Sequence, residues 1–294
     1  MTENLCRVVD SKFVNLSSQA NGGAIYFNKA IKLLIFRSFF VRCLTGQSYN
    51  GGGIYFESSK SLITFGNCAF GCVSGNGFFI YIKGAAKSNF FLNETMTANC
   101  SGSDHCVCYI HKLDLYSRMY NSSFCSSKVH CNVHSFRNEV TDSMFHQYYK
   151  NNLDIIYGAN SDGVKHRLSH ACLIENGRSN GNHGYIHINS FTNEVLTVNY
   201  LYAYGNDVGI PIANPQKGKI VINNFTGDRF TYAGNGQIST SNIIINSSFV
   251  MTTLFKNILV CEVNAKCTLK INQNVNFISV VPFLSYFMNF MSTA

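Results

Sequence analysis

Residues 22–27, Gly22-Gly23-Ala24-Ile25-Tyr26-Phe27, recur 29 residues later as Gly51-Gly52-Gly53-Ile54-Tyr55-Phe56, and the stretches after the two copies align without a gap. The tyrosine returns at Tyr81 and Tyr109. A cysteine recurs with a similar spacing, at Cys43, Cys72, Cys100 and Cys125. Self-similarity with a period of 20 to 50 residues is typical of a solenoid, in which each repeat buries its apolar face against its neighbours.

The composition favours strands over helices. Charged residues make up 13% of the chain, there are 3 Pro and no Trp, and hydrophobic residues reach 46%. Short β-rich runs alternate with small-residue turns such as Asn21-Gly22, Asn50-Gly51 and Gly75-Asn76-Gly77. Glycine and asparagine tolerate the positive φ that the corner of a coil demands. We therefore expect short parallel strands stacked coil upon coil, in an all-β chain without helices.

The repeats divide the chain into one long body and a tail. Residues 1–272 are predicted to form the solenoid, with about ten or eleven coils of roughly 27 residues each. Strands are expected at residues 24–27, 33–36, 54–56 and 62–65, among others. The first repeat is predicted to align Phe13-Val14-Asn15 with Val41-Arg42-Cys43. The pattern fades between residues 138 and 152, where we expect an irregular insertion.

The recurring cysteines are predicted to lie above one another along the solenoid. Cysteine is often buried without a covalent partner, so an apolar column of free thiols is the favoured interpretation. Disulfides between neighbouring coils remain the alternative, because the spacing of coils falls inside the Cα range of a disulfide. The even total of 12 Cys does not decide between them.

The glycine-glycine-small-Ile-Tyr-Phe blocks, with the apolar-x-Cys-apolar-Ser/Thr turn before them, resemble the repeats of polymorphic outer-membrane proteins. They are also similar to the Asn-rich right-handed parallel β-helix surface proteins of parasitic protists. The resemblance is strongest over residues 10–110. It implies a single-stranded right-handed parallel β-helix with three sides, a position on a cell surface or membrane, and an adhesin-like role. It carries over no functional residues.

Both ends of the chain lack the segments that such a destination predicts. The N-terminal residues have no apolar run of the length that a signal peptide needs, which is also expected of a fragment of a longer protein. Residues 273–294 form the most apolar stretch. Residues 277–291 are shorter than the roughly 20 residues of a spanning helix, so a terminal coil or cap and a degenerate membrane anchor both stay open.

Enzymes occur on similar scaffolds, and a polysaccharide lyase or glycoside hydrolase is the alternative to a binding protein. Such enzymes need carboxylates within several ångströms of one another. The 15 acidic residues are dispersed, and no two are adjacent or two apart. The nearest pair is Glu139 and Asp142, and stacking of coils could bring Asp207 to Asp228.

Cysteine and histidine crowd between residues 100 and 134, and both are zinc ligands. The members are Cys100, His105, Cys106, Cys108, His111, Cys125, His130, Cys131 and His134. The spacing fits no zinc finger, and stacking of Cys100 over Cys125 and of Cys106 over Cys131 accounts for it without a metal. Cys106 and Cys108 are predicted to share one strand face.

Glycosylation sequons occur at Asn15, Asn93, Asn99, Asn121, Asn224 and Asn246, a number that this composition gives by chance.

The net charge of +8 is modest, and its lysines and arginines are scattered rather than clustered. This distribution argues against a nucleic-acid partner and is compatible with an anionic glycan or membrane surface. The sequence thus predicts a non-enzymatic surface or interaction protein. Its partner would be an unidentified protein or glycan that binds the faces and turns, and no catalytic, cofactor-binding or metal-binding residue is assigned.

Overall fold

The computed structural model describes most of the chain up to residue 245 and two short strands beyond it. The described residues are 5–103, 106–127, 133–136, 140–149, 151, 155–157, 165–177, 186–188, 195–206, 212–213, 218–233, 236–245, 260–261 and 267–268.

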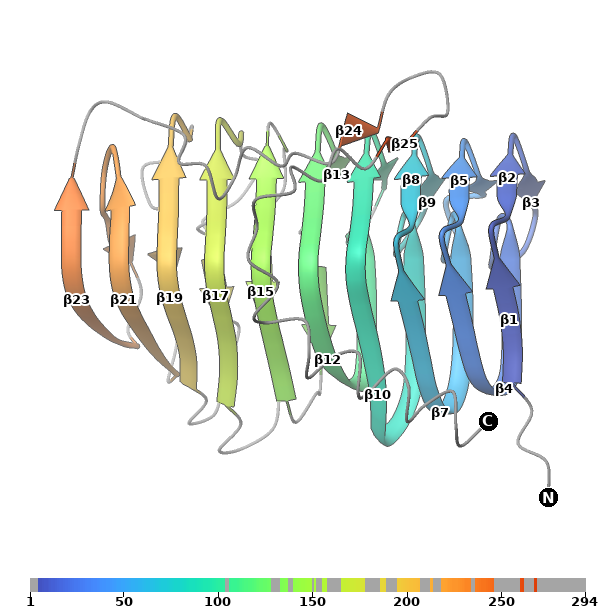
Figure 1. Ribbon diagram of the computed structural model, residues 1–294, viewed down its shortest axis with the longest axis horizontal. Helices are drawn as coiled ribbons and strands as arrows, with labels where there is room; N and C mark the ends of the chain where they lie inside the picture. The colour runs from blue at the N-terminus through green and yellow to red at the C-terminus, as the bar shows by residue number, and fades with distance from the viewer. Residues whose placement is uncertain are drawn as a thin grey trace.

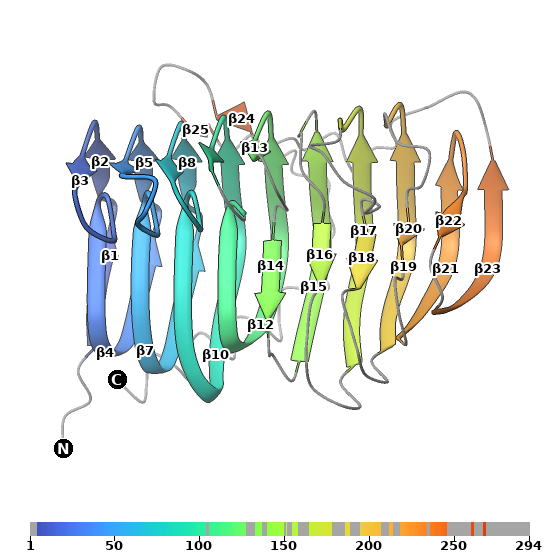
Figure 2. The same ribbon diagram turned by 180° about the vertical axis from the view of Figure 1, so that it is seen from behind.

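Parallel strands stack side by side along one axis, as Figures 1 and 2 show from opposite sides. Each strand of the longest row pairs in parallel with the next. In order, this row consists of β1 (Leu5–Val9), β4 (Ile25–Phe36), β7 (Ile54–Phe65), β10 (Ile80–Ala98), β12 (Cys108–Ser123), β15 (Val140–Tyr149), β17 (Lys165–Ile174), β19 (Val195–Tyr204), β21 (Lys219–Gly227) and β23 (Gln237–Ile245).

Shorter strands complete each coil. β2 (Lys12–Val14), β5 (Phe39–Val41) and β8 (Cys68–Phe70) extend the first row, where β8 pairs with the end of β10. On the opposite side β12 pairs with β14 (Val133–Phe136), followed by β16 (Ile155–Tyr157), β18 (Ile186–Ile188), β20 (Ile212–Ala213) and β22 (Tyr232–Ala233). A third sheet contains β3 (Ser17–Ser18), β6 (Leu44–Thr45), β9 (Val73–Ser74), β11 (Ser101–Gly102) and β13 (Ser126–Ser127).

This arrangement is a parallel β-solenoid, as the repeats predicted, and the described residues contain no helix. One antiparallel pair departs from the pattern. β24 (Val260–Cys261) pairs with β25 (Cys267–Thr268), so residue 268 does not continue the parallel stack that was expected to run to residue 272.

The long strands join two faces that the sequence separates. Residues 24–27 and 33–36 were predicted to be independent strands, but β4 is continuous from Ile25 to Phe36. Its pairing with β7 is irregular between Asn28 and Lys32, and the ribbon bends around the lower edge of the molecule there (Figure 1). The bend coincides with the polar residues of the stretch from Asn28 to Lys32, where the chain passes from one face of the solenoid to the next.

The interior is filled by every second residue of the strands. Leu33 and Ile35 are fully buried in the main apolar cluster, as are Leu62 and Leu92 in the coils above. Alternate side chains of a strand point to opposite faces, so one face of each strand lines the interior.

The corners repeat as strictly as the strands. Residues with positive φ recur at the same place in successive coils: Arg37, Gly66, Glu94 and Met119 have φ of 46°, 65°, 44° and 55°. Such a conformation is uncommon for residues other than glycine. Its repetition shows that the stacked coils impose it, since each corner is bonded through its backbone to the next, as in Arg37 N–H to Phe65 O at 2.9 Å.

Two predictions from the sequence were wrong, one about strand register and one about an irregular insertion. Val14 pairs with Val41, which sets Asn15 opposite Arg42 rather than Cys43, one residue from the predicted alignment. Residues 140–149, inside the expected insertion at 138–152, form the regular strand β15 between β12 and β17. The insertion was predicted because polar residues such as His146 interrupt the apolar pattern. His146 nevertheless lies inside the coil, where it forms hydrogen bonds.

The described residues include no helix long and apolar enough to cross a bilayer. Residues 273–294, which the sequence left open as a cap or an anchor, lie outside the described part of the chain.

Candidate functional site

A column of four tyrosines runs along the outer surface of β4, β7, β10 and β12. Their registers match directly, and their rings stack almost in parallel. Ring centroids are 5.2 Å apart between Tyr26 and Tyr55, 5.3 Å between Tyr55 and Tyr81, and 4.8 Å between Tyr81 and Tyr109. The prediction that these tyrosines lie over one another is confirmed.

Polar side chains flank this tyrosine column two residues further along each strand. Asn28, Glu57, Lys83 and His111 stand in register. The ammonium of Lys83 lies 3.1 Å from the carboxylate of Glu57; Lys83 is exposed and Glu57 is partly exposed. The hydroxyl of Tyr55 donates to the same carboxylate at 3.2 Å.

The surroundings of Tyr55 and Tyr81 favour the protonated form of these two hydroxyls. Burial, and then the neighbouring charge of Glu57, raise the pKa of Tyr55 well above its ordinary value. Burial also raises the pKa of Tyr81, partly offset by Lys83. The hydroxyls of Tyr55 and Tyr81 are therefore neutral hydrogen-bonding groups at physiological pH rather than nucleophiles.

The stacking decides what this surface offers to a ligand. Each ring face inside the column is covered by the next ring, so Tyr55 is buried while Tyr81 and Tyr109 keep part of their surface exposed. Tyr26, at the first position of the column, is 51% exposed. The result is a stack of tyrosine side chains beside the ion pair of Glu57 and Lys83 on a rigid sheet, which suits binding of an extended polar ligand.

A second polar cluster lies inside the solenoid, where no polar cluster was predicted. Ser117 Oγ is 2.7 Å from His146 Nε2, and His146 Nδ1 is 2.7 Å from the hydroxyl of Tyr148. Burial lowers the pKa of His146 to about 3, with Arg118 contributing, so the imidazole is neutral. Ser117 and His146 have no exposed surface. A serine beside a histidine resembles a nucleophile and its base, but a substrate has no access to it here.

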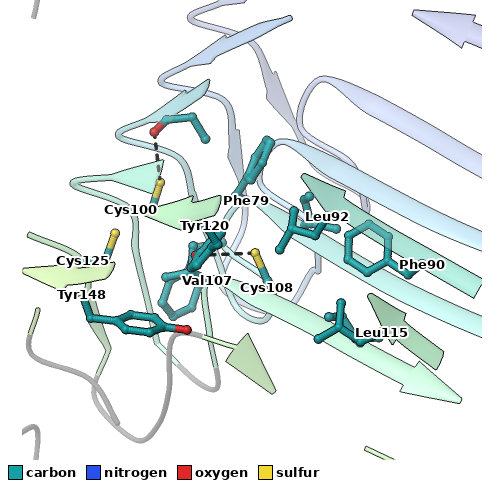
Figure 3. Packing of buried hydrophobic residues seen from close by; sticks show 14 of the residues in the cluster. Phe79, Phe90, Leu92, Cys100, Val107, Cys108, Leu115, Tyr120, Cys125 and Tyr148 are labelled. Atoms are coloured by element: carbon teal, nitrogen blue, oxygen red, sulfur yellow. Dashed lines mark hydrogen bonds between the residues drawn. The ribbon is translucent and has the colours of Figure 1, made fainter. Parts of the chain in front are cut away.

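Tyr120 extends the interior cluster toward the cysteines. Its hydroxyl is 3.0 Å from Thr97 Oγ1. It also accepts a hydrogen bond from the thiol of Cys108 at 3.8 Å, as Figure 3 shows. Burial raises the pKa of the Cys100, Cys108 and Cys125 thiols, so these groups stay protonated and unreactive. Cys43, Cys72, Cys100 and Cys125 are free and buried, which confirms the predicted column of thiols.

The carboxylate pairs considered from the sequence are not brought together among the described residues. Asp228 accepts the backbone N–H of Gly205 at 2.8 Å, which makes it a turn residue. Asp207 and Glu139 lie outside the described residues, and only the backbone of Asp142 is described.

The cysteine–histidine group between residues 100 and 134 forms no group of three metal ligands in the described part of the chain. Cys108 belongs to the main interior cluster, whereas Cys106 precedes β12 and packs separately beside Tyr109, so the prediction that the two share one strand face was wrong. His105, His130 and Cys131 lie outside the described residues, and of His134 only the backbone is described.

The sequons differ in access. Asn15 and Asn99 are exposed at corners, whereas Asn93 and Asn121 are buried, which closes those two to modification in the folded chain. Asn224 is half-buried, and Asn246 lies outside the described residues.

Sequence reasoning missed two further features. Asn151, Asn176 and Asn206 form a buried ladder of hydrogen bonds; their spacings of 25 and 30 residues were a signal that the abundance of asparagine concealed. Cys68, outside the cysteine column, is disulfide-bonded.

Comparison of the chain with protein-family models, with curated proteins and with solved structures found no match, so its function is argued from the residues alone.

Proposed function

We propose that this protein is a non-enzymatic, adhesin-like surface or interaction protein that binds its partner along the tyrosine column and its flanking charges. One observation carries the proposal. Ser117 and His146, which could react, are buried in the interior, while the ion pair of Glu57 and Lys83 reaches solvent beside the stacked tyrosines, of which Tyr26 is the most exposed.

A ligand with a repeating polar backbone suits this surface. The tyrosines repeat every 4.8 to 5.3 Å, which is the spacing of neighbouring strands, and a side chain held by stacked neighbours loses little further freedom on binding. The net charge of +8 favours an anionic partner. Among proteins and glycans, an anionic glycan is therefore the first ligand to test.

A location outside the cell is proposed on chemical grounds. The disulfide of Cys68 is typical of proteins that fold in an oxidising compartment. We further propose that the solenoid is right-handed, in keeping with the general hand of connections between parallel strands, and that it has about ten or eleven coils. The unbroken parallel pairing from β1 to β23 supports that length.

The binding surface is tested with one matched pair of variants. Lys83→Ala removes an exposed charge beside the tyrosine column, and Lys219→Ala removes an exposed charge on another face. On an array of anionic glycans we expect Lys83→Ala to weaken binding several-fold, since one charge contact contributes about 1 kcal/mol. Lys219→Ala should bind like the unchanged protein.

Three results would contradict the proposal. Equal effects of the two lysine variants would show that binding follows net charge only. Surface labelling of intact cells that leaves the protein unmarked would contradict the location. Turnover of a polyuronide, with or without calcium, would establish the enzyme that the sequence left as the alternative.

A further inference from the structure

The longest row of strands has an open edge at each end, on β1 and on β23. β1 pairs with β4 and β23 pairs with β21, and no other strand in the described part of the chain pairs with either of them. Figures 1 and 2 place β1 and β23 at opposite ends of the stack. An open edge presents backbone N–H and C=O groups with which a strand of another molecule can pair.

The edge of β23 lacks the features that usually prevent such pairing. Residues 237–245 include no charged residue and no proline, which proteins place on open edges to block them. The strand ends in three exposed isoleucines: Ile243 at 37%, Ile244 at 58% and Ile245 at 54%. Ile243 continues the row of Leu201 and Phe225, which are buried because coils lie on both sides of them. Its exposure therefore marks an interior row that lies open at this end.

The first and the last coil present the same rows of inward-facing side chains. Cys6 of β1 and Ile238 of β23 belong to one row, which is paired without a break through the long strands between them. Phe13 of β2 and Ile245 belong to a second such row. Phe13 follows Cys6 by 7 residues, and Ile245 follows Ile238 by the same number. A coil that begins like β1 therefore matches the edge of β23 residue for residue.

The corners and the charges of the two edges also fit each other. Asp10 and Asn242 stand at the corners of the first and the last coil, with φ of 49° and 52°, so the backbone turns in the same way at both ends. The exposed cations Arg7 and Lys12 meet no charge on β23, whereas two facing β1 edges would bring cations together. This asymmetry favours contact between unlike edges.

We propose that β23 of one molecule pairs in parallel with β1 of a second copy of this chain, so that the solenoids join end to end. Ile238 then lies against Cys6 of the second copy, and Ile245 lies against its Phe13. The contact covers the open interior rows of both molecules, and burial of their apolar side chains drives it. Because each molecule uses one edge for each neighbour, both ends of a pair stay open and the assembly grows into a linear chain.

Sedimentation of the full-length protein over a range of concentrations tests the association. We expect the average mass to rise from that of one chain to that of several. Ile243→Lys places an unpaired cation between the joined coils and should weaken association at least about 100-fold. Leu44→Lys is the matched control, because Leu44 is also 37% exposed but lies in β6, which has a strand on each side. A mass of one chain at every concentration, or equal effects of the two variants, would overturn the proposal.

Mixing two blocked variants tests whether unlike edges meet. Val8→Lys blocks the β1 edge, where Val8 is half-buried, and circular dichroism checks that both variants keep their strands. Each variant alone should remain a single chain. Their mixture should form dimers and nothing larger, since one retains an intact β23 edge and the other an intact β1 edge. Association of Val8→Lys by itself would show that two β23 edges meet, and a mixture of single chains would show that the edges do not meet at all.

A disulfide between copies tests the register. Cys6 is free, and neighbouring strands lie about 4.8 Å apart, which is within the Cα range of a disulfide. Mild oxidation of Ile238→Cys should link the copies into a ladder of covalent multimers on a non-reducing gel. The ladder should vanish when Cys6→Ser is added, and Thr240→Cys, two residues out of register, should form much less of it. A ladder that persists without Cys6 would overturn the proposed register.

Discussion

One corner of the solenoid is occupied by cysteine in the coils of β4, β7, β10 and β12, and by asparagine in the coils of β15, β17 and β19. Cys43, Cys72, Cys100 and Cys125 stand in one column, because the residues two places before them are paired in register. The same column continues through Asn151, Asn176 and Asn206. One position of the fold is thus filled by two residue types with different chemistry.

The two regions hold neighbouring coils together in different ways. In the first region the thiols make only weak contacts with carbonyls, such as Cys100 Sγ to Ala98 O at 3.5 Å and Cys125 Sγ to Ser123 O at 3.4 Å. In the second region each amide oxygen accepts a backbone N–H of the preceding coil, at 3.0 Å from Asn151 to Asn176. Packing of sulfur dominates one region and hydrogen bonding dominates the other.

The comparison predicts its largest effect in the asparagine region. Asn176→Ala removes the acceptor for the buried Asn151 N–H at 3.0 Å and one donor to Tyr148 O at 3.0 Å. We expect the free energy of unfolding to fall by about 3 kcal/mol, measured by urea denaturation. Asn28→Ala, at an exposed position without a positive φ, is the matched control and should change it little. A loss as small as that of the control would show that the ladder is not what stabilises this region.

Acid should destabilise the junction between the two regions through His146. Its pKa is about 3 in the folded chain and near the ordinary 6.5 when unfolded, so only the unfolded state takes up a proton between these values. This contribution is complete above pH 6.5 and declines as the pH falls toward 3, by about 2 kcal/mol between pH 7 and pH 5.

Denaturation of the unchanged protein and of His146→Gln, compared across this pH range, measures that contribution. The variant should lose less stability on acidification, although its stability at neutral pH is also altered by the changed hydrogen bonds to Ser117 and Tyr148. Identical slopes in the two proteins would assign the acid sensitivity to other groups, such as His166, whose pKa burial lowers to about 4.

The smallest effect is expected in the cysteine region. Cys100→Ala removes one buried sulfur and leaves no strong hydrogen bond unmade, so the expected loss is about 1 kcal/mol from lost packing. The measurement is the same urea denaturation. A cost equal to that of Asn176→Ala would remove the distinction between the two regions.

Repetition made the first region predictable. Tyr26, Tyr55, Tyr81 and Tyr109 keep one residue type at one position, so their register and their stacking could be derived from spacing alone. In the later coils the corner requires only a side chain that fits and satisfies its neighbours. Asparagine meets that requirement as well as cysteine does, and a change of residue type hides a position that is still the same.

By itself, the sequence determined the parallel stacking of coils and the columns of tyrosine and cysteine, because identical residues at a constant period lie over one another when strands pair in register. Only the tertiary structure decided which asparagines continue the cysteine column and how Ser117, His146 and Tyr148 bond in the interior. These features depend on contacts between residues that share no pattern, and such contacts exist only once the coils are stacked.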